Sequence, residues 1–314
     1  MVSGVTGYIF LPSCPPIVWN CMSPSVCTAP RQGIEEREPL CTGRRAIWSP
    51  HTGIVDWGQV ARHYGKVFRQ AGGSVLTGFE ATGFTRTGEG VTVSARDGRQ
   101  VTAGAVLACA GLQADRVARL TGAPSEPKIV PFRGEYLLLA ADKAAGIRGN
   151  IYPVPDPRLP FLGVHFTPRM DGQVWLGPNA VLALAREGYS WGNLSPRDLG
   201  EVLAYPGFYR LAYKYLGYGL DQMLGSLVLR RSVRELQKFV PSLTLADVAR
   251  GPAGVRAQAM SSEGDLVGDF IFHQGEGDVG DRVLHCRNAP SPAATSSLAI
   301  ARLIVDRMEE QFQL

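Results

Sequence analysis

Two histidines lie inside apolar, strand-like runs and are the first candidates for acid–base chemistry. His165 stands in residues 164–169 and His285 in residues 283–286. Because an imidazole titrates near neutral pH, either side chain could take the hydroxyl proton when an alcohol is oxidised by loss of a hydride. The alternative for each is a hydrogen-bonded place in the core, which is the commoner fate of a strand histidine, so both remain candidates.

Four arginines could bind a substrate that carries two carboxylates. They lie in Gly- or Pro-marked segments beside apolar runs: Arg133, Arg148, Arg169 and Arg256. A guanidinium grips a carboxylate through two parallel hydrogen bonds, which favours arginine over lysine for this task. Arg256 is our first choice. For any one of the four an exposed or ion-paired place is the alternative, and we expect it to hold for at least two of them.

Two segments of small residues could border a bound cofactor. An apolar run over 105–110 ends at Ala110 and Gly111, where only small residues let a backbone approach a ligand closely. Residues 288–295 lead from a strand into a helix, whose N-terminus favours negative charge such as that of a reduced flavin. An ordinary strand end and a proline-rich helix entry without a ligand are the alternatives.

Residues 275–280 spell the dinucleotide-binding pattern G-x-G-x-x-G, but their context is wrong for it. That pattern needs a helix to follow, so that its N-terminus meets the phosphates, whereas a strand-like run follows here. Glu276 and Asp278 would also place negative charge near the phosphates. We interpret this segment as a hairpin turn.

The composition indicates a globular protein and argues against nucleic-acid-binding and membrane-spanning proteins. The 314 residues are 45% hydrophobic and 19% charged, enough for a large core and about two domains. The net charge of +4 is spread along the chain, which argues against nucleic acid as a partner. The six cysteines show no zinc-type spacing and are expected to be free thiols, and no apolar run is long enough to cross a membrane.

The periodicity predicts a mixed α/β fold. Apolar positions spaced by three and four predict a helix from Trp57 to Ala71, after an Asp56 cap. Strands are expected at 74–77, 79–85, 91–95, 100–103, 105–110, 136–139, 161–166, 174–176, 269–272 and 282–286, and further helices at 208–218, 227–239 and 293–310. Residues 1–32 are rich in Pro, Ser and Cys, and we expect them to be disordered and unrelated to the rest.

Seven segments in order resemble L-2-hydroxyglutarate dehydrogenases, flavoproteins of the D-amino-acid-oxidase-like superfamily. The segments are 49–56, 129–136, 149–155, 163–169, 177–180, 251–258 and 288–297. The resemblance covers nearly everything from Gly33 to Leu314 and implies FAD-dependent oxidation of L-2-hydroxyglutarate to 2-oxoglutarate. It further implies an electron acceptor other than oxygen, a quinone-linked carrier being one candidate, and a mitochondrial location.

The same resemblance implies a discontinuous FAD-binding domain at 33–125 and 250–314, of incomplete Rossmann-like type, around a mixed-sheet substrate domain at 126–249. The histidine and arginine segments would face the substrate together with Tyr152. The residues expected to border the flavin are Ala110, Gly111, Gly254, Asn288, Pro290, Ser291, Ala293, Ala294 and Thr295.

The sequence departs from the family pattern before Gly33, where the nucleotide-binding unit is expected. Members begin with a strand, a Gly-rich turn and a helix that hold the ADP half of FAD, and no such unit precedes Gly33 here. A catalytically inactive variant that binds only a dicarboxylate or a partner chain is therefore an alternative, and a related flavin amino-acid oxidase is another. Residues 1–32 also lack a mitochondrial presequence, which makes a cytosolic location the alternative.

Overall fold

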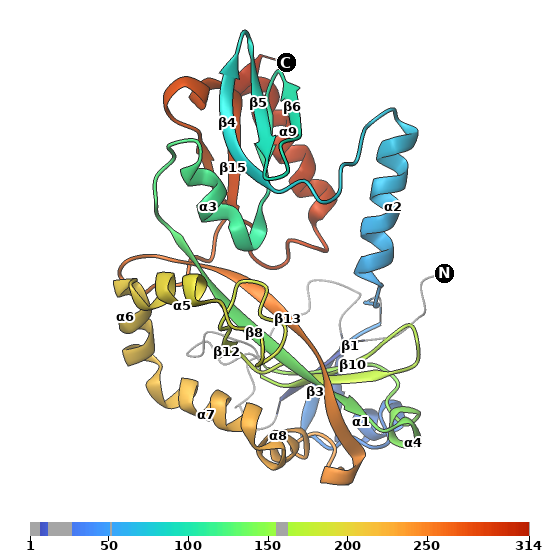
Figure 1. Cartoon of the computed structure of the whole chain (residues 1–314). Helices are drawn as coiled ribbons and strands as arrows, with labels where there is room; N and C mark the ends of the chain where they lie inside the picture. The colour runs from blue at the N-terminus through green and yellow to red at the C-terminus, as the bar shows by residue number, and fades with distance from the viewer. Residues whose placement is uncertain (1–6, 12–26, 51, 155–162, 314) are drawn as a thin grey trace. The chain divides into compact units, whose positions relative to one another are not determined.

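The structure, a computed structural model, describes residues 7–11, 27–50, 52–154 and 163–313 (Figure 1). It is a mixed α/β protein with several sheets, as predicted. The chain divides into two units, each assembled from three chain segments. Unit 1 comprises Met1–Ser74, Arg133–Val181 and Tyr215–Gly254, and unit 2 comprises Val75–Phe132, Leu182–Lys214 and Val255–Leu314.

A nine-stranded sheet is the framework of unit 1. Its order is β12 (Val181–Leu182), β8 (Lys128–Leu139), β11 (Val174–Gly177), β10 (His165–Pro168), β9 (Asn150–Pro153), β1 (Gly7–Leu11), β3 (Arg45–Ser49) and β2 (Cys27–Pro30), with β13 (Val248–Met260) paired to β8. β1 runs parallel to β9 and antiparallel to β3. β8 and β13 each continue from one unit into the other.

The helices of unit 1 are α1 (Arg31–Arg37), α2 (Trp57–Gln70), α4 (Ala141–Ala144), α7 (Leu216–Leu227) and α8 (Leu229–Leu236), with a 3-10 turn η2 (Leu245–Asp247). The core lies where α8 packs on the sheet: Ile151, Phe166 and Leu176 are fully buried with Leu236. Alternate residues of a strand point to opposite faces, which is why Val174 and Leu176 are buried and Trp175 is not.

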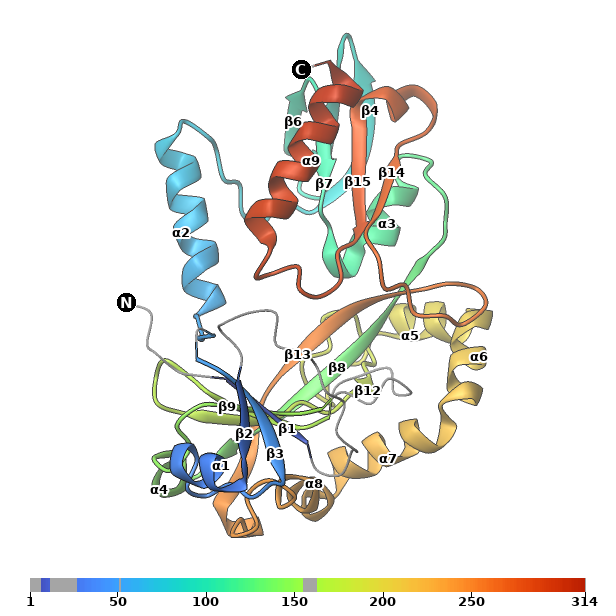
Figure 2. The ribbon, with the colours of Figure 1, turned by 180° about the vertical axis from the view of Figure 1, so that it is seen from behind.

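Unit 2 contains two three-stranded sheets. One has the order β14 (Ile271–Gln274), β15 (Val283–Asn288), β7 (Val106–Ala108), and the other is the meander β4 (Ala81–Thr87), β5 (Gly90–Ala95), β6 (Gln100–Ala103). The helices are α3 (Ala114–Arg119), α5 (Pro196–Leu203), α6 (Pro206–Lys214) and α9 (Ser297–Phe312), with 3-10 turns η1 (Gly111–Gln113) and η3 (Gly277–Arg282). Figure 2 shows α9 lying along the sheet of β7, β15 and β14, where Ile304 and Phe312 pack on Leu284.

Several local predictions are confirmed and some are wrong. The helix after Asp56 is α2, and Asp56 accepts a hydrogen bond from the backbone N–H of Gln59 at 3.1 Å. The predicted strand at 74–77 does not form, the predicted helix at 208–218 is divided between α6 and α7, and the last helix begins at Ser297 instead of 293. The predicted domain boundaries remain a prediction.

The prediction that residues 1–32 are disordered and unrelated is wrong for its described parts. Residues 7–11 form β1 between β3 and β9, and residues 27–30 form β2 on β3. Prolines in the surrounding sequence suggested disorder, but pairing with distant strands supplies backbone hydrogen bonds that local composition does not reveal.

Candidate functional site

The carboxyl ends of β7 and β15 meet at one edge of the small sheet in unit 2. The two strands are parallel, with Val106 beside Val283 and Ala108 beside His285. In open α/β sheets this is the edge at which ligands bind. Two of the segments predicted to border a cofactor, Ala110 with Gly111 and the residues from Asn288 onward, therefore lie at the same edge, although nearly 180 residues separate them.

Gly111 leaves bare backbone at this edge. Its φ is +49°, a left-handed conformation that favours glycine, and a Cβ built there would meet no other atom within 4 Å. The chain turns here from β7 into η1 and α3. The position thus combines a backbone that requires glycine with open space in which a planar group can approach.

Asn288 connects the end of β15 to the segment between β13 and β14, where the N–H of Val267 donates to the carbonyl of Ala259 in β13 at 2.9 Å. Its Nδ2 donates to the carbonyl oxygens of Val267 at 3.1 Å and Asp269 at 2.8 Å. Val267 packs in one cluster with Ala110 and Ala257. The part of β13 that belongs to unit 2 is thereby held beside the edge. Arg256 precedes Ala257 and points to the opposite face of the strand, where it is exposed.

The segment between β15 and α9 is a series of turns. The N–H of Ala293 donates to the carbonyl of Pro290 at 3.0 Å, and the hydroxyl of Thr295 donates to that of Pro292 at 3.0 Å. Ser291, Ala294 and Thr295 are exposed. These residues therefore offer small side chains and backbone groups at the sheet edge. Gly254, the remaining residue predicted to border the flavin, is exposed on β13 and belongs to unit 1.

His285 lies in the core of unit 2 with 1% of its surface exposed. Its Nε2 is 2.7 Å from the hydroxyl of Thr121. Burial lowers its pKa to about 4, with further contributions from the charges of Arg287 and His273. This environment favours the core alternative for His285 over the role of a catalytic base.

His165 lies in unit 1 in a different environment. It is half-buried on β10, and its ring stacks on Tyr152 of β9 with centroids 4.6 Å apart. The N–H at Nδ1 donates to the carbonyl of Gly163 at 3.4 Å, which places the acceptor lone pair on Nε2. His165 and Tyr152, each predicted to face the substrate, are thus brought into contact by adjacent strands.

The arginines of unit 1 differ in accessibility. Arg133 is fully buried and forms an ion pair with Glu135, with Nη2 3.0 Å from Oε1. Arg148 donates to the carbonyl of Glu36 at 3.2 Å. The guanidinium of Arg169 lies 4.2 Å from the ring centroid of Trp175, and such stacking keeps the in-plane N–H groups available to a carboxylate.

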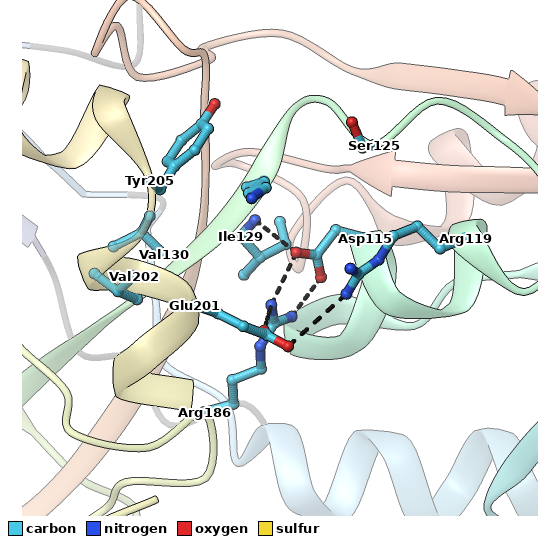
Figure 3. A pocket seen from close by; sticks show the side chains of 10 residues that line it. Asp115, Arg119, Ser125, Ile129, Val130, Arg186, Glu201, Val202 and Tyr205 are labelled. Carbon is cyan, nitrogen blue, oxygen red and sulfur yellow. Dashed lines mark hydrogen bonds and ion pairs between the residues drawn. The ribbon is translucent and has the colours of Figure 1, made fainter. Parts of the chain in front are cut away.

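A cluster of charges in unit 2 was not found from the sequence (Figure 3). Arg186 is buried and forms an ion pair with Asp115, with Nη2 2.8 Å from Oδ2. Arg116 of α3 reaches Asp198 of α5 at 2.5 Å and Glu201 at 2.8 Å. The partners are 71 to 85 residues apart, so no spacing pattern reveals them.

These charges satisfy one another. Burial raises the pKa of Asp115, but the hydrogen bond and charge of Arg186 outweigh it and hold that pKa below its usual value. The pKa of Glu201 is also lowered, because Arg116 outweighs the effect of burial. We interpret the pocket that this cluster lines as a structural junction between α3 and α5 rather than as a substrate site.

The G-x-G-x-x-G segment is a hairpin connection, as predicted. It overlaps the first part of η3 and lies in the connection between β14 and β15, which are antiparallel. Among the described residues no cluster of His, Cys, Asp and Glu suits a metal ion. No helix in the described part of the chain is long and apolar enough to cross a membrane.

Known proteins similar to this chain were found at the level of family, sequence and fold. The family described as FAD dependent oxidoreductase matches residues 25–307. The chain is 52% identical over 297 residues to the mitochondrial L-2-hydroxyglutarate dehydrogenase of Nematostella vectensis, and 48% identical over 295 residues to that of Homo sapiens. These matches cover 90% of this chain but only 65% and 64% of the two relatives.

Solved structures share the fold at low identity. The L-alpha-glycerophosphate oxidase of Mycoplasma pneumoniae, with FAD bound, has a TM-score of 0.69 at 15% identity and covers 97% of this chain and 73% of its own. The glycine oxidase of Geobacillus kaustophilus has a TM-score of 0.63 at 14% identity, with 98% and 72% covered. At this level of identity the likeness concerns the fold alone.

Proposed function

This chain belongs to the family of FAD-dependent oxidoreductases, and we propose that it oxidises L-2-hydroxyglutarate to 2-oxoglutarate with FAD as cofactor and an electron acceptor other than oxygen. The observation that carries the proposal is the 52% and 48% identity, over 90% of the chain, to two relatives named for that activity. Both relatives are longer than this chain, so the activity is a matter for experiment.

The edge formed by β7 and β15 fits the flavin ring. Gly111 leaves open space above its backbone, and the turns at 289–296 present small residues beside it. When bound there, FAD would supply the acceptor for the hydride. The G-x-G-x-x-G sequence lies between antiparallel strands, so it does not supply the phosphate contacts.

Arginine side chains would hold the substrate. The resemblance makes Arg256 and Arg169 the first candidates for the carboxylate contacts. Arg256 is exposed on β13, and Arg169 stacks on Trp175 in unit 1. Arg133 is the weaker candidate, because Glu135 already neutralises its buried charge. A bidentate arginine contact fixes the orientation of a carboxylate as well as its affinity.

His165 would take the hydroxyl proton. Its Nε2 carries the lone pair, and stacking on Tyr152 restrains the ring. His285 lacks these features because it is buried against Thr121. The relevant step is removal of one proton by an imidazole, after which the carbon–hydrogen bond can break with transfer of a hydride.

The first experiment is a visible absorption spectrum of the purified chain after incubation with FAD and removal of the excess. Retained flavin that bleaches on addition of L-2-hydroxyglutarate without air would support the proposal. Retained flavin that does not bleach would overturn the substrate assignment. If no flavin is retained, the chain is an inactive variant. Peroxide formation with an amino acid would instead favour an amino-acid oxidase.

A mitochondrial location is a further part of the proposal, because both relatives named above are described as mitochondrial. Fractionation of cells that express the natural full-length protein tests it. Recovery with mitochondrial markers would support the assignment, and recovery with cytosolic markers would contradict it.

A further inference from the structure

Cys109 and Cys286 are neighbours across the parallel pair β7 and β15. The register places Ala108 beside His285, so the next residue along each chain is a cysteine. Adjacent strands are about 4.8 Å apart. That spacing lies within the range of roughly 4.4–6.8 Å between Cα atoms that a disulfide spans.

The two thiols also project to the same face of the sheet. Val106 and Val283 pack together on one face. Ala105 packs with Leu284 and Cys286 on the other face, beneath α9. Since side chains alternate along a strand, Cys109 shares the face of Ala105 and hence that of Cys286. A bond between the two sulfur atoms can therefore form without either side chain moving to the opposite face of the sheet.

The thiols differ in exposure and in acidity. Cys109 is exposed and Cys286 is buried. The Cys286 thiol, which donates to the carbonyl of Asn288 at 3.9 Å, lies close enough to lower the pKa of Cys109 to about 7, whereas the pKa of Cys286 is raised by the same contact and by burial. At neutral pH about half of Cys109 is thiolate, while its neighbour retains its proton. One accessible nucleophile beside one protected thiol is the arrangement of a reactive cysteine with a resolving partner.

We propose that Cys109 and Cys286 form a redox-active pair, which a low-molecular-weight disulfide such as glutathione disulfide converts into a cross-strand disulfide. The thiolate of Cys109 attacks one sulfur of glutathione disulfide and releases one glutathione thiolate, which takes the proton of Cys286. The sulfur of Cys286 then attacks that of Cys109 and displaces the second glutathione. Two protein thiols are oxidised, and one small disulfide is reduced to two thiols.

This cross-link would join the two segments of the sheet edge. Cys109 immediately precedes Ala110 and Gly111, and Cys286 lies two residues before Asn288. Oxidation would thus tie both sides of the proposed flavin-binding edge through a covalent bond. The formation of the disulfide itself does not depend on flavin binding or on the substrate.

The test is peptide mapping under non-reducing conditions. The whole chain is reduced, incubated natively with glutathione disulfide, quenched with N-ethylmaleimide and digested with trypsin. With the quench carried out in denaturant, we expect peptide 100–116 to be linked to peptide 283–287. Cys41 in peptide 38–44 should be recovered alkylated, because burial protects it from glutathione disulfide during the native incubation. Stable glutathione on Cys109 with alkylated Cys286, or a link from Cys109 to any other cysteine, would overturn the proposal.

Two variants provide matched controls. In Cys286→Ser, Cys109 should retain one glutathione as a stable mixed disulfide, since no resolving thiol remains. In Cys109→Ser, Cys286 should stay reduced. Cys286→Ala, which leaves no side-chain donor at this position, should slow the alkylation of Cys109 at pH 7 roughly tenfold, as its pKa returns toward about 8.5. Circular dichroism of each variant checks that the fold is kept, and the wild-type peptide map decides the proposal even where a variant does not fold.

Discussion

The hydroxyl of Thr121 lies 2.7 Å from Nε2 of His285 and also donates to the carbonyl of Ala118 at 2.9 Å. A hydroxyl has one proton, so toward His285 it must accept. His285 therefore carries a proton on Nε2, and because burial lowers its pKa to about 4 the ring is neutral in the folded protein at neutral pH. This relationship makes His285 a buried, uncharged member of the core, and it has a direct consequence for stability at acidic pH.

We expect stability to fall as the pH drops from about 6.5 toward 4. The unfolded chain protonates His285 near pH 6.5, whereas the folded protein does so only near pH 4. Between these values the unfolded chain binds more protons, so acidification favours unfolding, by on the order of 2 kcal/mol after allowance for screening. Urea denaturation at pH 7 and pH 5 measures the effect. His285→Gln should weaken the dependence of the unfolding free energy on pH. The control His63→Gln, at an exposed position, should leave it as it is. An unchanged pH dependence in His285→Gln would show that His285 is not the buried neutral group responsible.

The buried pair of Asp115 and Arg186 should be costly to break. Asp115→Asn removes the buried ionic partner of Arg186 and leaves only the more exposed Glu201 at 3.2 Å, so we expect a loss of about 3 kcal/mol in unfolding free energy. Glu80→Gln removes one partner of the exposed pair with Arg96 and should leave the denaturation midpoint unchanged. Equal midpoints for both variants would show that the buried pair contributes little.

His165→Gln tests the proposed base. Glutamine keeps a polar side chain but cannot take a proton, so kcat with L-2-hydroxyglutarate should fall by roughly 10²- to 10⁴-fold with little change in KM. His285→Gln is the matched control and should retain most of the activity. A dye-linked assay on flavin-loaded protein measures both. If His285→Gln is the inactive variant and His165→Gln is not, the two assignments must be exchanged.

Arg256→Lys and Arg169→Lys test the carboxylate contacts. Lysine keeps the charge but loses the two-pronged geometry, so we expect KM to rise roughly 10- to 100-fold. Arg148→Lys serves as the control, because that guanidinium is engaged with the carbonyl of Glu36. Steady-state kinetics over a range of substrate concentrations separates KM from kcat. A rise of KM in the Arg148 variant alone would contradict the proposed substrate contacts.

Gly111→Ala tests the flavin-binding edge. The added methyl group has room in the protein alone, so its cost to folding is backbone strain of about 1–2 kcal/mol. Gly98→Ala is a close control, with φ at +87° and equally open surroundings in the turn between β5 and β6. We expect both variants to lose similar stability, but only Gly111→Ala to retain less FAD after gel filtration. Equal FAD retention would place the flavin elsewhere.

Local features of the fold were predictable from the sequence, and long-range ones were not. α2 could be found because Asp56, the apolar spacing and two glycines mark its limits within 18 residues. The meander of β4, β5 and β6 could be found because Asp97 and Gly98 mark a turn. β1 was missed because its stability comes from β3 and β9, which lie far along the chain.

The candidate site shows the same division. Small residues identified Gly111 and the turns after Asn288, because close approach of a ligand requires them. The neutral state of His285 depends on burial against Thr121, which is 164 residues away. The ion pair of Arg186 depends on Asp115 in the same way. Tertiary packing decides whether a side chain is removed from water and which partner it meets. The local sequence around His165 and His285 therefore could not separate them, and both remained candidates for the base.

The pairing of β7 with β15 also sets an order of events during synthesis. A ribosome adds about 5–20 residues per second, so the roughly 175 residues between these strands take on the order of 10–35 seconds. During that interval β15 does not yet exist, so the backbone N–H and C=O groups along one side of β7 are unpaired. The helix α9, which packs on the same sheet, has not been made either. Each unit of this protein is completed only when its last chain segment, which ends at Gly254 or Leu314, has been made, so the nascent chain carries an unpaired strand edge until then.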